Sequence, residues 1–273
     1  DSEEITSDHV QKALDEKIFR CSLIKDRISE LIEDGTLLID TAGERTGQVN
    51  ALSVVPTGDV LFGRPNRITA TVTAGRSGVV DIERKTKLGG PIHNKGVMIL
   101  TGYLSRIAEH RPLAVSAHLV FEQSYGQVEG DSASLAELTA LISALSSQPL
   151  RQSIAVTGSV NQHGAVQAVG GVNEKIEGFF DTCEIAGRTG DEGVIIPAAN
   201  AQNLMIRQDV AEAVEEGSFH VWRVETVEEA LSVLCAAEPE DIFSAARERL
   251  EGFREALGEL VSQDPADDQA DEE

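Results

Sequence analysis

The stretch EGDSAS, residues 129–134, directly precedes a strongly amphipathic segment and is the most informative part of the sequence. Leucine and isoleucine recur at helical spacing over residues 133–147, which predicts a helix that begins just after Ser132. The free N–H groups and the positive dipole end of this helix would stabilise negative charge developing beside Ser132. These are the surroundings of a nucleophilic serine. Taken alone, a Gly-x-Ser turn is more often an N-cap, and Ser134 with Glu137 fits a capping box.

A base for this serine is offered by a second stretch, GGVNEKIEGF at residues 170–179. Its apolar residues, Val172, Ile176 and Phe179, form one face of a predicted helix, and Lys175 borders that face. Burial lowers the pKa of an amine, so a lysine held there can accept a proton from a hydroxyl near neutral pH. The alternative for an isolated lysine is a surface position, with only its aliphatic stem against apolar neighbours.

Together the two stretches resemble the proteolytic domain of the Lon protease family. The family's serine motif, G-x-S-A-(G/S), is matched at residues 130–134, and its lysine motif, G-G-x-x-x-K, at residues 170–175. The separation of the two motifs and the intervening VTG at residues 156–158 also fit, and the resemblance covers roughly residues 45–236. The serine motif EGDSAS and the run LGGPIHNKGV at residues 88–97 are similar to the B-type branch. The run at residues 62–90 is similar to Lon-like bacterial ATP-dependent proteases.

The resemblance implies a Ser–Lys dyad in which Ser132 attacks the peptide carbonyl and Lys175 accepts the serine proton. Thr157 matches the family threonine that orients the lysine, and Glu129 and Asp131 match acids near the dyad. Physically, a carboxylate beside Lys175 raises the pKa of the amine and opposes base catalysis. We therefore expect such an acid to act as a gate or to form part of an inactive arrangement.

The fold expected from the resemblance is α+β, the Lon proteolytic-domain fold of mixed sheets with flanking helices, preceded by a short helical segment. We expect a helical segment at residues 1–44, the proteolytic domain at 45–236, a C-terminal helix at 237–260 and an acidic disordered tail at 261–273. The patterns predict two helices within residues 3–34 and further helices at 97–107, 133–147, 172–182, 209–216, 226–236 and 240–260. They predict strands at 37–39, 49–55, 68–73, 79–84, 113–121, 153–160, 194–197 and 221–224.

The chain has no G-x-x-x-x-G-K-(S/T) loop, so no cofactor is expected in it, and ATP and Mg²⁺ are expected in a missing module. Residues 1–44 would then be the end of that module or a linker from it. The resemblance implies a six-membered ring that degrades unfolded or damaged proteins. The competing hypothesis is a domain that assembles the ring but is catalytically silent as a fragment.

Composition limits the other function classes. A net charge of −23 disfavours nucleic-acid binding, and no apolar run is long enough to span a membrane. Three cysteines without a C-x-x-C pair indicate reduced thiols in a cytoplasmic protein. His93 and His163 have no partner at ligand spacing, so no metal site is predicted, and His118 is expected to be packed. An α/β-hydrolase esterase would need a His–acid pair after Ser132, which the sequence does not offer.

Overall fold

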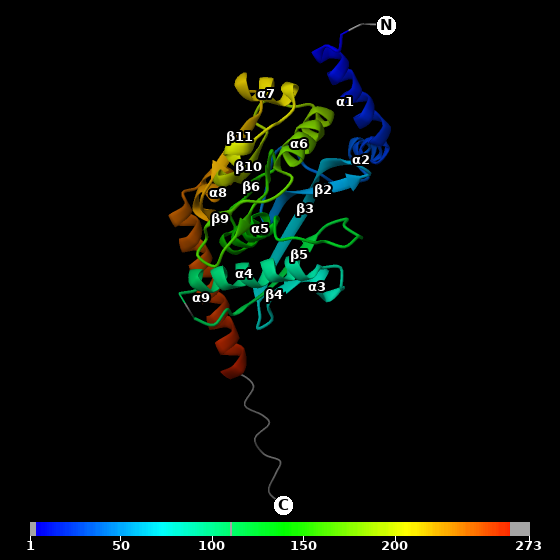
Figure 1. The fold of residues 1–273 in the computed structure, drawn as a ribbon. Coiled ribbons are helices and arrows are strands. Elements are labelled where there is room, and N and C mark those ends of the chain that lie inside the picture. The colour runs from blue at the N-terminus through cyan, green and yellow to red at the C-terminus, as the bar shows by residue number, and fades with distance from the viewer. Residues whose placement is uncertain (1–3, 110, 263–273) are drawn as a thin grey trace, which may run out of the picture.

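A seven-stranded mixed sheet forms the centre of the computed structural model, which describes residues 4–109 and 111–262 (Figure 1). The strand order is β11-β10-β7-β2-β3-β5-β4. The strands are β2 (Gln48–Thr57), β3 (Val60–Ala74), β4 (Gly78–Asp81), β5 (Val115–Phe121), β7 (Ile154–Val156), β10 (Gly193–Pro197) and β11 (His220–Val224). Two small sheets pair β1 (Glu44–Arg45) with β6 (Leu150–Arg151) and β8 (Ser159–Val160) with β9 (Val166–Gln167).

The sheet combines a parallel half with an antiparallel half. β2, β7, β10 and β11 run parallel, whereas β3 is antiparallel to both β2 and β5, and β4 lies parallel to β5 at the edge. β2 and β3 form a long hairpin whose last pair is Thr57 with Val60. Gly58 lies in its turn with a φ of 61°, the left-handed conformation that glycine adopts without strain.

The helices cover both faces of the sheet. They are α1 (Ser7–Cys21), α2 (Leu23–Glu33), α3 (Ile82–Lys85), α4 (Pro91–Ile107), α5 (Ser134–Ser146), α6 (Val172–Ala186), α7 (Gln208–Glu215), α8 (Val227–Leu234) and α9 (Pro239–Ser262), with a 3₁₀ helix at Ala198–Asn203. α4, α5, α8 and α9 contribute to one apolar core, and α6 and α7 to a second core. Successive residues of a strand contribute to the two cores in turn, because their side chains point to opposite faces of the sheet. In β7, Ile154 and Val156 belong to the first core and Ala155 to the second.

The helix α5 and the two N-terminal helices, α1 and α2, are the extremes of burial. Every residue of α5 is buried, which agrees with its position between the sheet and the helices α4, α8 and α9. By contrast, neither α1 nor α2 contains a buried residue, and Figure 1 shows both at one end of the molecule. None of the helices in the described part of the chain combines the length and apolar composition that crossing a bilayer requires.

The α+β class is confirmed, and most predicted elements are present. Three predictions of local structure are wrong. Residues 37–39 form no strand, the predicted strand at 79–84 ends at Asp81 and gives way to α3, and the predicted strand at 153–160 is broken between Val156 and Ser159. The domain boundaries remain predictions, and most of the predicted acidic tail, residues 263–273, lies outside the described residues.

Candidate active site

Ser132 lies in a turn immediately before α5, as the sequence predicts. Gly130 has a φ of 89°, so the chain reverses there in a conformation that disfavours a side chain. Ala133 occupies the N-cap position and Ser134 is the first helical residue, so the predicted capping box is wrong. Ser134 is buried, and its Oγ instead accepts a hydrogen bond from the Val160 amide at 3.1 Å. The serine turn is thereby held by contacts to another part of the chain.

Those contacts come from the segment between β7 and β8, where the predicted strand is interrupted. The carbonyl of Ser132 accepts a hydrogen bond from the Gly158 amide at 2.8 Å and another from the Thr157 hydroxyl at 3.2 Å. The Leu135 amide donates to the Gly158 carbonyl at 3.1 Å. At the interruption, both backbone groups of Gly158 point toward the serine turn, whereas the Thr157 amide still donates to the Ile195 carbonyl of β10 at 3.0 Å.

Lys175 projects from α6 into this turn. Its side chain is almost completely buried, with 2% of the residue exposed. The Nζ group donates hydrogen bonds to Ser132 Oγ and to Thr157 Oγ1, each at 3.0 Å. Burial lowers the pKa of Lys175 to about 8, although the negative charge of Asp131 acts in the opposite direction. The structure thus brings together the three residues that the sequence indicates, from three separate segments of the chain.

The position of Lys175 depends on a close contact between α6 and β3. A Cβ atom added to Gly63 would lie 1.9 Å from the Glu174 carbonyl oxygen and 2.7 Å from the Lys175 Cα. A Cβ atom added to Gly178 would lie 2.2 Å from the Gly63 carbonyl oxygen. The two glycines let the helix backbone approach the strand more closely than any side chain permits.

Two backbone amides beside Ser132 are available to a substrate. Within the described residues, the N–H groups of Ser132 and Ala133 have no hydrogen-bond partner, whereas Ser134 N–H already donates to the Asp131 carbonyl. They stand at the N-terminal end of α5, where the partial positive charge of the helix adds to that of the amides. The arrangement is suited to binding an oxyanion.

The two acids of the serine stretch occupy different places. Asp131 accepts a hydrogen bond from Ser159 Oγ at 3.0 Å, and its charge acts on Lys175. Glu129 instead lies at the start of α4, where its carboxylate accepts the Ile92 amide at 3.1 Å and so caps the helix. Of the two acids, Asp131 is the one whose negative charge raises the pKa of Lys175.

The remaining nucleophile and base candidates do not form a second site. Cys183 and Cys235 are buried, and burial raises the pKa of both thiols, that of Cys235 to about 11. Cys21 is partly buried and unpaired. His118 is exposed on β5, so the expectation that it is packed is wrong.

Known proteins resemble this chain over most of its length. The family model described as the Lon protease (S16) C-terminal proteolytic domain matches residues 92–237. A Lon protease homolog of Escherichia coli (strain K12) is 47% identical over 237 residues, which are 86% of this chain and 40% of that protein. An archaeal Lon protease of Thermococcus kodakarensis is 31% identical over 220 residues, 81% of this chain and 32% of that protein. The chain therefore spans about 40% or less of the length of these relatives.

Proposed function

Because the chain belongs to the Lon protease family through the C-terminal proteolytic domain, we propose that it is a serine endopeptidase whose dyad is Ser132 and Lys175. The observation that supports this most directly is the 3.0 Å contact between Lys175 Nζ and Ser132 Oγ in buried surroundings. A buried amine with a pKa near 8 loses its proton readily enough to serve as a general base near neutral pH.

The proposed reaction begins with uncharged Lys175. Its lone pair accepts the hydroxyl proton of Ser132 as Oγ bonds to the peptide carbonyl carbon, and the carbonyl oxygen becomes an oxyanion. The N–H groups of Ser132 and Ala133 stabilise that charge. The Lys175 ammonium then donates its proton to the leaving amine as the C–N bond breaks, and water hydrolyses the resulting ester by the same proton transfers in reverse order. Thr157 keeps Nζ directed at the serine by its hydrogen bond.

The experiment that tests this proposal measures cleavage of casein and of a fluorogenic peptide by wild type, Ser132→Ala and Lys175→Ala. We expect each variant to lose about a thousandfold or more in kcat/KM, since the dyad acts as a unit. Ser232→Ala and Lys85→Ala replace exposed residues elsewhere and serve as matched controls. Equal cleavage by wild type and both dyad variants would eliminate the proposed mechanism.

We further propose that the whole protein couples this activity to ATP-driven unfolding and forms a six-membered ring in the cytoplasm. The chain covers only part of its relatives, so the nucleotide module would lie in the part of the protein that it does not span. The alternative is a chain that assembles but does not cleave on its own. Light scattering and peptide cleavage by the chain and by the full-length protein separate the two, because a silent assembly domain would form rings without hydrolysing the peptide.

A further inference from the structure

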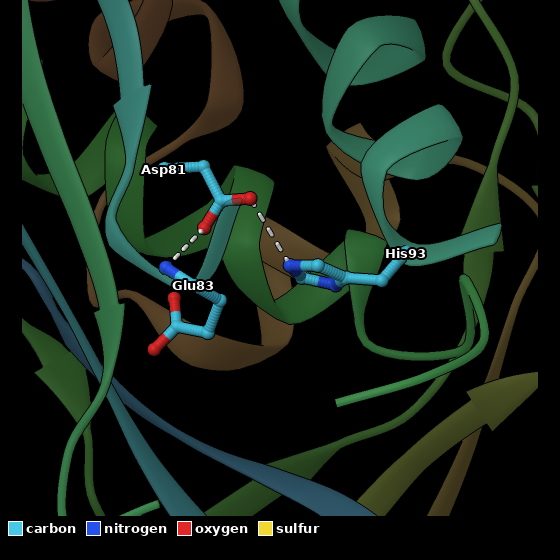
Figure 2. A group of neighbouring side chains, drawn as sticks. All are labelled: Asp81, Glu83 and His93. Carbon is cyan, nitrogen blue, oxygen red and sulfur yellow. Dashed lines mark hydrogen bonds and ion pairs between the residues drawn. The ribbon is translucent and has the colours of Figure 1, made fainter. Parts of the chain in front are cut away.

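A cluster of buried ionisable side chains lies apart from the proposed dyad. Asp81 ends β4, Glu83 belongs to α3, and His93 lies in the first turn of α4. Figure 2 shows Asp81 in contact with both other residues, with the His93 ring facing a carboxylate oxygen of Asp81. The three residues are 1–3% exposed. Charged groups are rarely buried this deeply unless they are paired or coordinate a metal.

Asp81 and Glu83 each accept one backbone hydrogen bond, and each of the three side chains has a polar atom without a hydrogen bond in the described part of the chain. Asp81 Oδ1 accepts the Glu83 amide at 3.1 Å, and Glu83 Oε1 accepts the Phe121 amide at 3.0 Å. His93 Nδ1 faces Glu137 Oε1 at 3.8 Å. Asp81 Oδ2 and His93 Nε2 lie 3.2 Å apart as an ion pair but have no hydrogen bond of good geometry. Glu83 Oε2 has no hydrogen-bond partner among the described residues, and one ligand atom from each of the three residues lies within 4.8 Å of those of the others.

Several buried polar atoms without a hydrogen bond lie close together here, and this requires an explanation. Buried polar groups in folded proteins almost always have a partner, and an exception often indicates an ion or water. Glu137 Oε1, on the neighbouring helix α5, also lacks a hydrogen bond. Three carboxyl groups therefore surround a single imidazole, which in its protonated form balances only one of them. A divalent cation would give the free oxygens a partner and would stabilise the ionised forms of the carboxyl groups.

We propose that Asp81, Glu83 and His93 bind one divalent transition-metal cation of the Zn²⁺ or Mn²⁺ class. His93 Nε2 and Asp81 Oδ2 are 3.2 Å apart, close to the separation of about 3 Å between adjacent ligands that each lie about 2.1 Å from one ion. An imidazole with carboxylates suits these ions, whereas Ca²⁺ prefers oxygen ligands alone. Glu137 would orient the ring through Nδ1, as carboxylates commonly do for metal-bound histidines.

The ion would join the elements that support the serine turn. Its ligands come from the β4–α3 corner and from α4, and Glu137 adds a contact to α5. On α4, a Cβ atom added to Gly96 would lie 3.2 Å from the Asp131 Cβ, so α4 packs directly against the serine stretch. The role of the ion is therefore structural, and its detection does not depend on peptidase activity.

The test is metal binding during refolding, because the ligand atoms are buried. The chain is unfolded in guanidinium chloride with a chelator and refolded with Zn²⁺, with Mn²⁺ or without metal, and the washed protein is analysed by plasma mass spectrometry. His93→Gln is the test variant, and His163→Gln, which changes an exposed histidine, is the matched control. We expect about one ion per chain in wild type and His163→Gln, and a melting temperature about 5 °C higher with metal than without it.

In His93→Gln we expect metal content at least tenfold lower and no shift of melting temperature with metal. Equal metal content in His93→Gln and wild type would overturn the proposal, as would a wild type that refolds fully yet retains no metal. If His93→Gln does not fold, the binding of Co²⁺ to the wild-type chain is measured instead. Visible absorption bands of bound Co²⁺ that Zn²⁺ abolishes would support the site, and their absence would overturn it.

Discussion

At the scale of single residues, Thr157 joins the two halves of the proposed dyad. Its hydroxyl accepts a hydrogen bond from Lys175 Nζ and donates one to the Ser132 carbonyl. Thr157→Val keeps the shape of the side chain and removes both bonds. We expect kcat to fall about tenfold or more with little change in KM, because the amine loses its orientation while the peptide-binding surface is unchanged. Peptide hydrolysis at several substrate concentrations measures both parameters.

Thr182→Val is the matched control for that substitution. Thr182 is also buried, lies on the same helix as Lys175 and donates its hydroxyl to the Gly178 carbonyl. Thr182→Val should lose about 1 kcal/mol of unfolding free energy, the usual contribution of one hydrogen bond, and Thr157→Val, which loses two, should lose about 2 kcal/mol. An equal fall in kcat for Thr182→Val would mean that the loss reflects general destabilisation and not the orientation of the lysine.

The pKa of Lys175 predicts the pH dependence of cleavage. Only the uncharged amine accepts the serine proton, so kcat/KM should rise with pH through about 8 and become constant above it. Asp131→Asn removes the negative charge that raises this pKa, so the midpoint should move to lower pH. Asp15→Asn, on α1, changes the net charge by the same amount as Asp131→Asn and should leave the pH midpoint unchanged. A midpoint that stays the same or rises in Asp131→Asn contradicts the assignment.

The sequence predicts which residues form this site better than it predicts which other residues they contact. Ser132, Lys175 and Thr157 follow from two motifs and the short stretch between them, and the structure brings all three together. The role of Glu129 in capping α4 is not apparent from the sequence, because Ile92 lies far from it in the chain. His93 appears isolated for the same reason, since Asp81 and Glu83 belong to other elements at no regular spacing.

At the scale of secondary structure, the contact between α6 and β3 determines where Lys175 lies. Gly178→Ala would place a methyl group 2.2 Å from the Gly63 carbonyl oxygen, so the helix must move away from the strand. We expect a loss of about 2 kcal/mol or more in unfolding free energy and a larger loss in kcat, because the Nζ to Oγ distance increases. Denaturant unfolding and peptide cleavage measure the two effects.

Gly252→Ala is the same substitution in another helix. A Cβ atom there would meet nothing within 4 Å, so the change should raise the unfolding free energy by about 0.5–1 kcal/mol through helix propensity alone. Activity should be unchanged. Gly178→Ala with normal stability and activity would show that the close contact between α6 and β3 does not position Lys175.

The long elements were predictable because their patterns are regular, and the exceptions have physical causes. α4, α5, α6 and α9 each extend over several turns with periodic apolar residues. α3 has only four residues, too few for a period to be recognised. The apolar run at 153–160 suggests one strand, but the backbone of Gly158 and the hydroxyl of Thr157 bind the serine turn. That tertiary contact overrides local strand preference.

At the scale of the whole molecule, the two ends of the described chain differ in their contribution to the core. α1 and α2 have no buried residue, and the ion pair of Lys25 with Asp181, at 2.6 Å, is one of their few contacts to α6. Val10 and Leu14 are about half exposed along α1. This exposed apolar surface can pack against a partner, and the assignment of residues 1–44 to the end of another module or to a linker stays a prediction.

Unlike α1 and α2, α9 contributes several side chains to the core, and removing each end of the chain in turn tests this difference. Ile242, Ala246 and Leu250 are 0–1% exposed and belong to the same core as α5. Removing residues 238–273 should leave a chain that does not fold, because large buried aliphatic side chains contribute about 2–5 kcal/mol each and the total stability of a domain is about 5–15 kcal/mol.

Removing residues 1–34 should change the melting temperature by about 3 °C or less. Circular dichroism on both truncations, with one ending at Ser262 as the control, measures this. A folded chain without α9, or an unfolded one without α1 and α2, would show that the core is not distributed as the structure indicates.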